Sequence, residues 1–329
     1  MTQPVHASQI KRRTLVSALL TAGAAQGLAL RAFAQAGLTR MILPFPSGNT
    51  VDVTARVLVD AIGRTSVHQL IVENKAGAGG IVGTTEVVRG KPDGSILLYT
   101  TGGLMSNAVL YKKLPYDVMK DLTPITQVVE SAGFMLLVRK ESPYQSLDQF
   151  IAAARAKPGT VSFGSFGIGN GTHLVGELFA RSANVRLLHV PYKGSPDIDL
   201  MGGTLDSMVI GASSAIPMIE SGRTRALAVS GNERSKLAPT VPAFVEFGLK
   251  DVDVPAYTAI WAPAGMKPDL ALSLRDEIVR ASVDPAFQRQ LELTGGRFVG
   301  SSPAEFRKRL ALELANYQRW LPPLGIALD

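Results

Sequence analysis

The feature that most limits the fold is a regular alternation of short apolar runs with longer amphipathic segments. Apolar runs at 40–43, 68–72 and 95–100 are typical of buried strands, and residues 50–64 have apolar side chains at helical spacing. The alternation continues with strands expected at 134–139, 161–165, 185–190, 205–210 and 225–229, and helices expected to end at 88, to span 172–182, and to start near 146, 195, 284 and 302.

Alternating strands and helices predict mostly parallel sheets with helices on both faces. A chain of 329 residues is long enough for about two domains. The expected strands are too many for a single sheet in a chain of this length, so we divide them between two lobes. The predicted fold class is therefore α/β, with each lobe a mostly parallel sheet flanked by helices.

The first 36 residues are laid out like a secretory signal peptide. Basic residues at 11–13 precede an apolar, small-residue run at 14–30, and cleavage is expected after Ala34 or Ala36. The run is short and interrupted by Gly and Gln, which favours a cleaved signal over a membrane anchor. The paired arginines leave general and twin-arginine export open. We expect the mature protein in the periplasm.

Composition excludes several functions. The chain has no cysteine, so disulfides, thiolate metal sites and thiol nucleophiles are absent. Removing the signal takes four basic residues from 34, and the remaining 30 are nearly balanced by 27 acidic ones. No Lys/Arg-rich run or nucleic-acid motif occurs, so we expect no nucleic-acid partner. We also expect no cofactor.

Two strand–turn–helix units, at 42–50 and 163–173, are the main candidate site. Each passes through Gly, Ser and Asn before a helix begins. Helix N-termini have unpaired N–H groups and a positive dipole end, so two such turns facing a cleft could bind a carboxylate without a buried Arg. They could equally be ordinary turns. Asp52 is expected to cap its helix and hold the first loop, and Trp261 is expected to pack in the core.

Enzyme signatures are missing. Neither loop has phosphate-loop spacing, and the glycines at 77–80 lack the dinucleotide-binding spacing. No nucleophile elbow or metal-binding spacing occurs. A pair of Ser165 with His173 has no evident orienting acid. We therefore expect no catalysis and no metal site.

The two loops and several other stretches of the chain resemble the Bug-type periplasmic solute-binding proteins of the tripartite tricarboxylate transporter family. The resemblance extends over nearly all of the mature chain, and no single stretch is decisive. Their order and number make the match specific. The matching stretches are 44–48, 72–80, 91–94, 114–117, 164–174, 189–194, 225–229 and 262–265.

The resemblance implies a two-lobed Venus-flytrap fold with crossing strands, and a ligand-carboxylate site formed by the two loops, partly through ordered water. We expect residues 37–138 and 257–329 in one lobe and 139–256 in the other. The expected ligand-binding residues are Phe45, Pro46, Ser47, Gly48, Asn49, Ser165, Phe166, Gly167, Gly169, Asn170, Thr172, His173, Tyr192, Lys193, Ile210 and Gly211.

Departures from the family pattern bear on the ligand. The family usually has Gly-Gly where this chain has Gly48-Asn49, and Phe166 stands where Pro is common. Ile210-Gly211 aligns with a polar pair, and an acidic residue there could bind an amino group. We therefore predict an organic acid with an apolar or aromatic body rather than an amino acid.

The resulting prediction is a monomeric periplasmic protein that closes around a small carboxylate and docks on the membrane subunits of a tripartite transporter. The alternatives are a sensor that presents its ligand to a signalling receptor, and a serine hydrolase. Gene deletion with measurement of uptake against induction would separate transport from sensing. Turnover lost on Ser165→Ala would indicate the hydrolase.

Overall fold

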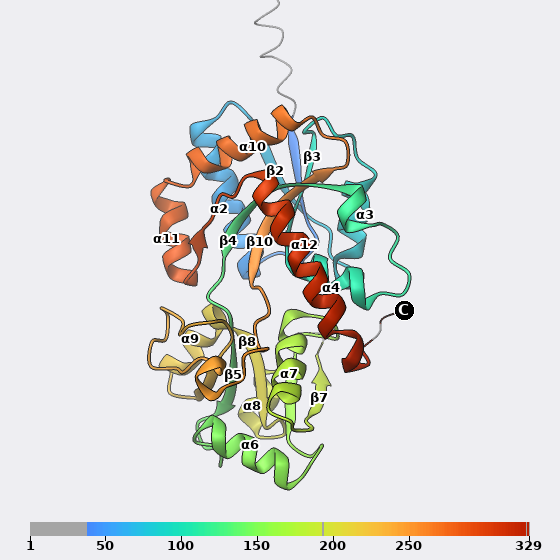
Figure 1. The fold of residues 1–329 in the computed structure, drawn as a ribbon. Helices are drawn as coiled ribbons and strands as arrows, with labels where there is room; N and C mark the ends of the chain where they lie inside the picture. Colours follow the sequence, from blue (N-terminus) through green and yellow to red (C-terminus); the bar gives the residue numbers. More distant parts are fainter. Residues whose placement is uncertain (1–37, 193, 327, 329) are drawn as a thin grey trace, which may run out of the picture.

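The computed structural model describes residues 38–192, 194–326 and 328, which form two lobes (Figure 1). The segment 131–133 carries the chain from the first lobe into the second, and residues 254–256 bring it back. The expected signal peptide lies outside the described residues. Within the described part of the chain, no helix has the length and apolar character required to cross a bilayer.

The first lobe contains a six-stranded sheet in the order β11-β4-β10-β3-β1-β2. Its strands are β1 (Thr39–Leu43), β2 (Leu70–Asn74), β3 (Ile96–Thr101), β4 (Leu122–Glu130), β10 (Tyr257–Pro263) and β11 (Arg297–Phe298). Its helices are α2 (Thr50–Thr65), η1 (Ala78–Gly80), α3 (Ile81–Val88), α4 (Gly103–Leu110), α5 (Val118–Asp121), α10 (Pro268–Ala281), α11 (Pro285–Thr294), α12 (Pro303–Trp320) and η3 (Pro322–Leu324).

Both faces of this sheet are covered, which explains the nearly continuous apolar run of β1. Successive strand residues point to opposite faces. Met41 and Leu43 pack in the cluster of α2, α10 and α11, whereas Ile42 belongs to the cluster of α4 and α12 with Trp261 and Phe306. Trp261 is 1% exposed, so the expectation that it packs in the core is confirmed.

The second lobe contains a five-stranded sheet in the order β7-β6-β8-β5-β9. Its strands are β5 (Phe134–Arg139), β6 (Ser162–Ser165), β7 (Leu188–Pro191), β8 (Ser207–Gly211) and β9 (Thr224–Val229). Its helices are α6 (Leu147–Ala156), α7 (Gly171–Ser182), α8 (Asp197–Gly202), α9 (Ala212–Glu220) and η2 (Phe244–Phe247).

The two-lobed α/β fold class is confirmed, but both sheets are mixed. β1 is parallel to β2 and β3, and β6 is parallel to β7 and β8. β10 and β5 are antiparallel to both of their neighbours. The chain passes between lobes through these strands, and they run against the βα units beside them. This arrangement supplies the antiparallel pairing that local alternation did not predict.

Pairing also corrects the expected lobe boundary. We placed it after residue 138, which falls inside β5. Because β5 pairs with β8 and β9, it belongs to the second lobe, and the first crossing lies at 131–133. The apolar run of β5 would have the same local pattern in either lobe, so the sequence could not show to which lobe this strand belongs.

Candidate functional site

A cleft of about 610 Å³ lies between the lobes, on one side of segments 131–133 and 254–256. We call it the front cleft. This size suits a small organic ligand. Glycine, small hydroxyl residues and aromatic rings dominate its walls, and no charged side chain is found among the described residues that line it. Any charge on a ligand must therefore be met by neutral groups. The aromatic members of the lining are Phe45, Tyr111, Phe134, Phe166, Tyr257 and Tyr317.

Helix N-termini from both lobes converge on this cleft. The first turns of α2 and α4 and the turn before α3 line it from the first lobe. The starts of α7 and α9 line it from the second lobe. N–H groups in a first helical turn have no partner within the helix, and the dipole favours an anion there. The cleft is therefore suited to bind negative charge through backbone amides.

Loop one, residues 44–49, is fixed in position by the Asp52 side chain. The Asp52 carboxylate accepts hydrogen bonds from the Gly48 N–H at 2.9 Å and from Asn74 Nδ2 at 2.9 Å, and it pairs with Arg56. Burial acts to raise the pKa of Asp52, but the bonds from Arg56, Gly48 and Asn74 outweigh burial and lower that pKa to about 2. Asp52 supports the loop, although Asn49 rather than Asp52 caps α2.

Loop two, residues 165–170, is fixed by the first turn of α7. Asn170 caps the helix by accepting from the Thr172 N–H at 3.0 Å, and Thr172 Oγ1 accepts from the Phe166 N–H at 3.0 Å. His173 Nδ1 accepts from the Gly169 N–H at 3.1 Å. This bond places the proton of a neutral His173 on Nε2, 3.6 Å from a Glu177 oxygen. These side chains set the loop's shape.

Ser165 is buried beneath loop two. It is 0% exposed, and its Oγ lies within hydrogen-bond distance of His189 Nε2, at 2.7 Å. Its histidine partner is therefore His189 and not the expected His173. The rings of His173 and His189 stack with centroids 3.9 Å apart. Burial, followed by the neighbouring His173, lowers the pKa of His189 to about 4. A serine with no exposed surface offers no nucleophile to a substrate in the cleft.

The structure brings only part of the expected site to the front cleft. Phe45, Pro46, Phe166, Gly169, Asn170 and Gly211 line it. Ser47, Gly48, Asn49, Gly167, Thr172 and His173 belong to the two loops or their helix starts but are not among its lining residues. Ile210 packs in the second-lobe core, Tyr192 donates to Asp199, and Lys193 lies outside the described residues.

Two helix starts that we did not predict, those of α4 and α9, also line the cleft. At the start of α4, Thr101 Oγ1 accepts from the Gly103 N–H and the Gly102 carbonyl accepts from the Met105 N–H. At the start of α9, which has no side-chain cap, the Gly133 carbonyl accepts from the Ala212 N–H. Asn49 and Asn170 likewise each occupy one N–H group, in α2 and α7 respectively. The sequence signal for α4 and α9 is a glycine directly after a strand with no capping residue. Because this signal contains no capping residue, the sequence pattern does not predict these two helix starts.

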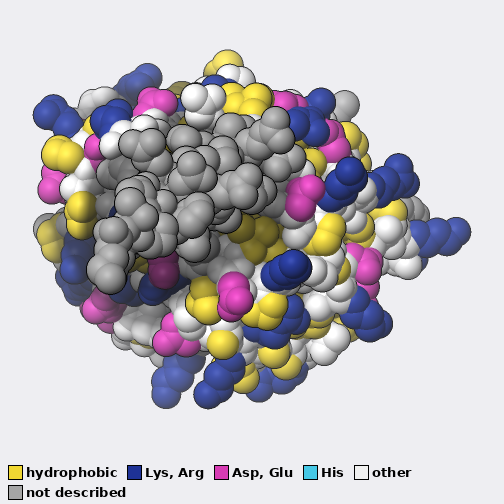
Figure 2. All heavy atoms as spheres, turned by 90° about the horizontal axis from the view of Figure 1, so that it is seen from above, with side chains coloured by type: hydrophobic (Ala, Val, Ile, Leu, Met, Phe, Trp, Pro, Cys, Tyr) yellow, Lys and Arg dark blue, Asp and Glu magenta, His cyan; other side chains and the backbone are white. Residues whose placement is uncertain are grey.

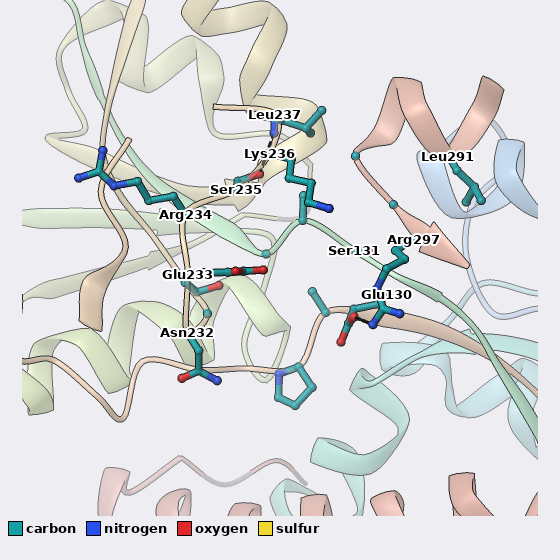
Figure 3. A pocket seen from close by; sticks show the side chains of 18 of the residues that line it. Glu130, Ser131, Asn232, Glu233, Arg234, Ser235, Lys236, Leu237, Leu291 and Arg297 are labelled. Atoms are coloured by element: carbon teal, nitrogen blue, oxygen red, sulfur yellow. Dashed lines mark hydrogen bonds and ion pairs between the residues drawn. The ribbon is translucent and has the colours of Figure 1, made fainter. Parts of the chain in front are cut away.

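A second cavity of about 1090 Å³ lies on the opposite side of the crossing segments. Segments 131–133 and 254–256 line both cavities, so they separate the two. Figure 3 shows Arg297 reaching toward Glu130 on one wall, with Glu233 and Lys236 on the opposing loop. Acidic and basic groups are mixed in this back cavity, so it presents no uniform field for a charged ligand. The front cleft is the better ligand site.

Two lobes joined by crossing segments around a cleft define a ligand-binding protein of the periplasmic type. The chain belongs to a known family of this class, because the model described as "Tripartite tricarboxylate transporter family receptor" matches residues 54–319. Protein BugT of Bordetella pertussis is 32% identical over 285 residues, covering 85% of this chain and 86% of BugT.

Solved structures agree in fold over almost their whole length. Rpa4515 of Rhodopseudomonas palustris, solved with adipate, has 26% identity and a TM-score of 0.79, covering 88% of this chain and 98% of that chain. MatC of the same organism, solved with bound malate, has 26% identity and a TM-score of 0.77, covering 86% and 99%. The family and the Venus-flytrap fold implied by the sequence are thus confirmed.

Proposed function

We propose that this protein captures a small carboxylate in the front cleft and delivers it to the membrane subunits of a tripartite transporter. The observation that carries the proposal is the convergence of helix N-termini from both lobes on a cleft lined by no charged side chain. The similar proteins solved with malate and adipate support a carboxylate ligand.

Capture proceeds by closure and involves no chemical step. A ligand that touches both lobes stabilises the closed arrangement by its higher affinity for it. The aromatic side chains Phe45, Phe134 and Phe166 favour an apolar or aromatic body between or beside the carboxylates. We further propose that the protein works as a monomer in the periplasm after cleavage near Ala34 or Ala36.

A binding panel tests the ligand class. Mono- and dicarboxylates, including malate, adipate and benzoate, are compared with amino acids by calorimetry on the mature protein. Saturable binding of a carboxylate without turnover is expected. Tighter binding of amino acids than of every simple acid would contradict the proposed ligand class.

Ser213→Asp tests the location of the site. Ser213 lies in the uncapped first turn of α9 and lines the cleft. An Asp there stabilises a helix start by about 0.3–1 kcal/mol, so the protein should fold, but its carboxylate competes with the ligand for the same amides. Binding should fall below detection.

Ala304→Asp is the matched control, because Ala304 lies in the first turn of α12 and does not line the cleft. Its affinity should equal that of the unmodified protein. Unchanged binding by Ser213→Asp, with melting temperatures preserved in both variants, would place the ligand elsewhere.

A further inference from the structure

Glu313 of α12 is a buried acid with no settled partner. It is 5% exposed, and neither carboxyl oxygen makes a hydrogen bond of standard geometry. Such groups are uncommon, because loss of water penalises the charged carboxylate. Burial raises the pKa of Glu313 to about 7, and the opposing effects of Arg309, Tyr257 and Tyr317 are smaller. This acid changes charge close to neutral pH.

The carboxyl group lies directly behind the wall of the front cleft. Gly102 lines that cleft, and a Cβ built on it would lie 3.3 Å from Glu313 Oε1. The same Cβ would lie 2.8 Å from Cε1 of Tyr257, whose ring also lines the cleft, as does that of Tyr317. A residue without a side chain and two tyrosine rings therefore separate this acid from the ligand space.

Gly102 is also the residue before helix α4. Only Gly102 would separate a ligand carboxylate bound beside it in the cleft from Glu313. The negative charge of that carboxylate and the charge of an ionised Glu313 repel one another, and burial of Glu313 reduces the screening by water. The repulsion disappears when Glu313 is protonated.

The charged groups around Glu313 do not remove this conflict. Arg309, one turn earlier on α12, lies 4.4 Å over the Tyr257 ring and binds the Gln127 side chain. It lines the back cavity rather than the front cleft. Asp253, before the return crossing, acts on the neighbouring Tyr317, and burial raises the pKa of Asp253. No other basic group acts on the Glu313 carboxyl among the described residues.

We infer that Glu313 takes up a proton when a carboxylate binds in the front cleft, so that capture of the anion is linked to capture of a proton. This inference rests on the proposed function. A bound anion raises the pKa of Glu313, so the complex holds more protons than the free protein. Affinity is then highest at pH values below the free pKa and falls as pH rises through it.

The test measures the affinity for adipate between about pH 6 and about pH 8.5, where the ligand remains ionised. Each unit by which binding raises the pKa of Glu313 weakens the affinity about tenfold across this range. Repeating the titration near neutral pH, in buffers with different heats of ionisation, measures proton uptake directly and needs no variant. Adipate should bind about tenfold more weakly at the upper limit if binding shifts the pKa by about one unit.

Glu313→Gln should bind adipate with a nearly constant affinity over this range and without proton uptake. Glu277→Gln is the matched control, because Glu277 is 8% exposed and pairs with His68 away from the cleft. It should keep the pH dependence of the unmodified protein.

Constant affinity and no proton uptake in the unmodified protein would overturn the inference, as would a pH dependence retained by Glu313→Gln. In both cases the proposed function would stand. Absence of binding by every carboxylate in the panel at every pH would instead contradict the proposed function itself.

Discussion

At the scale of single residues, Asp52 shows how one buried carboxylate organises loop one without lining the front cleft. It is 2% exposed and joins the Gly48 amide, Asn74 and Arg56. Sequence reasoning predicted this supporting role from its place near a helix start. The Asn74 contact comes from β2 and could not be predicted, because it depends on how two distant segments pack.

Asp52→Asn should lower the free energy of unfolding by about 2 kcal/mol at neutral pH. The pKa of Asp52 falls from 3.8 to about 2 on folding, so its stabilisation is fully present above about pH 4 and is lost as the pH falls toward about 2. Urea unfolding of both proteins from pH 7 down to pH 2 should therefore show the difference vanishing at the acid end.

Asp60→Asn on the same helix is the control, because Asp60 is exposed. Its unfolding free energy should change by less than about 0.5 kcal/mol. Equal effects of the two substitutions at neutral pH would show that the loop contacts of Asp52 contribute nothing.

At the scale of elements, the caps of α7 and α6 allow local stability to be separated from ligand binding. Asn170 caps α7 at the cleft, and Ser146 caps α6, which lies away from it. Asn170→Ala and Ser146→Ala should each cost about 1 kcal/mol of stability by urea unfolding. Calorimetry should show weaker ligand binding for Asn170→Ala alone, because loop two loses its anchor. Equal affinities in the two variants would separate loop two from the site.

The elements also show which local signals were sufficient. The cap at Ser146 and the capping box of Ser302 with Glu305 marked the starts of α6 and α12 correctly. The helices α4 and α9 have no such signal, and β4 and β10 were not recognised as strands. The starts of α4 and α9, which line the cleft, were therefore the hardest to find.

At the scale of the whole molecule, the crossing segments lie between two cavities that must change in opposite directions when the lobes rotate. Figure 2 shows basic side chains dispersed among acidic and hydrophobic ones on the uncovered part of the first lobe's outer face. This dispersion gives the visible part of the face no uniform sign. In the proposed mechanism, closure depends on a ligand that bridges the cleft.

Pairs of spin labels attached to introduced cysteines can measure this rotation, because the chain has no native cysteine that would also be labelled. One pair joins Val82 of α3 to Ile168 of loop two, across the front cleft, and another joins Lys236 to Glu292, across the back cavity. All four side chains are exposed. Saturating ligand should shorten the first distance and lengthen the second. Two unchanged distances would contradict hinge closure.

By itself, the sequence determined the elements whose signals are local, such as β1 with its continuous apolar run and α12 with its capping box. It also determined the family, because ordered short stretches carry that resemblance. The tertiary structure decided which helix starts meet at the cleft and placed Glu313 behind Gly102. The physical reason is that caps and periodicity report each segment's own burial, whereas these contacts depend on β10 pairing with β3 and β4, more than a hundred residues earlier in the chain.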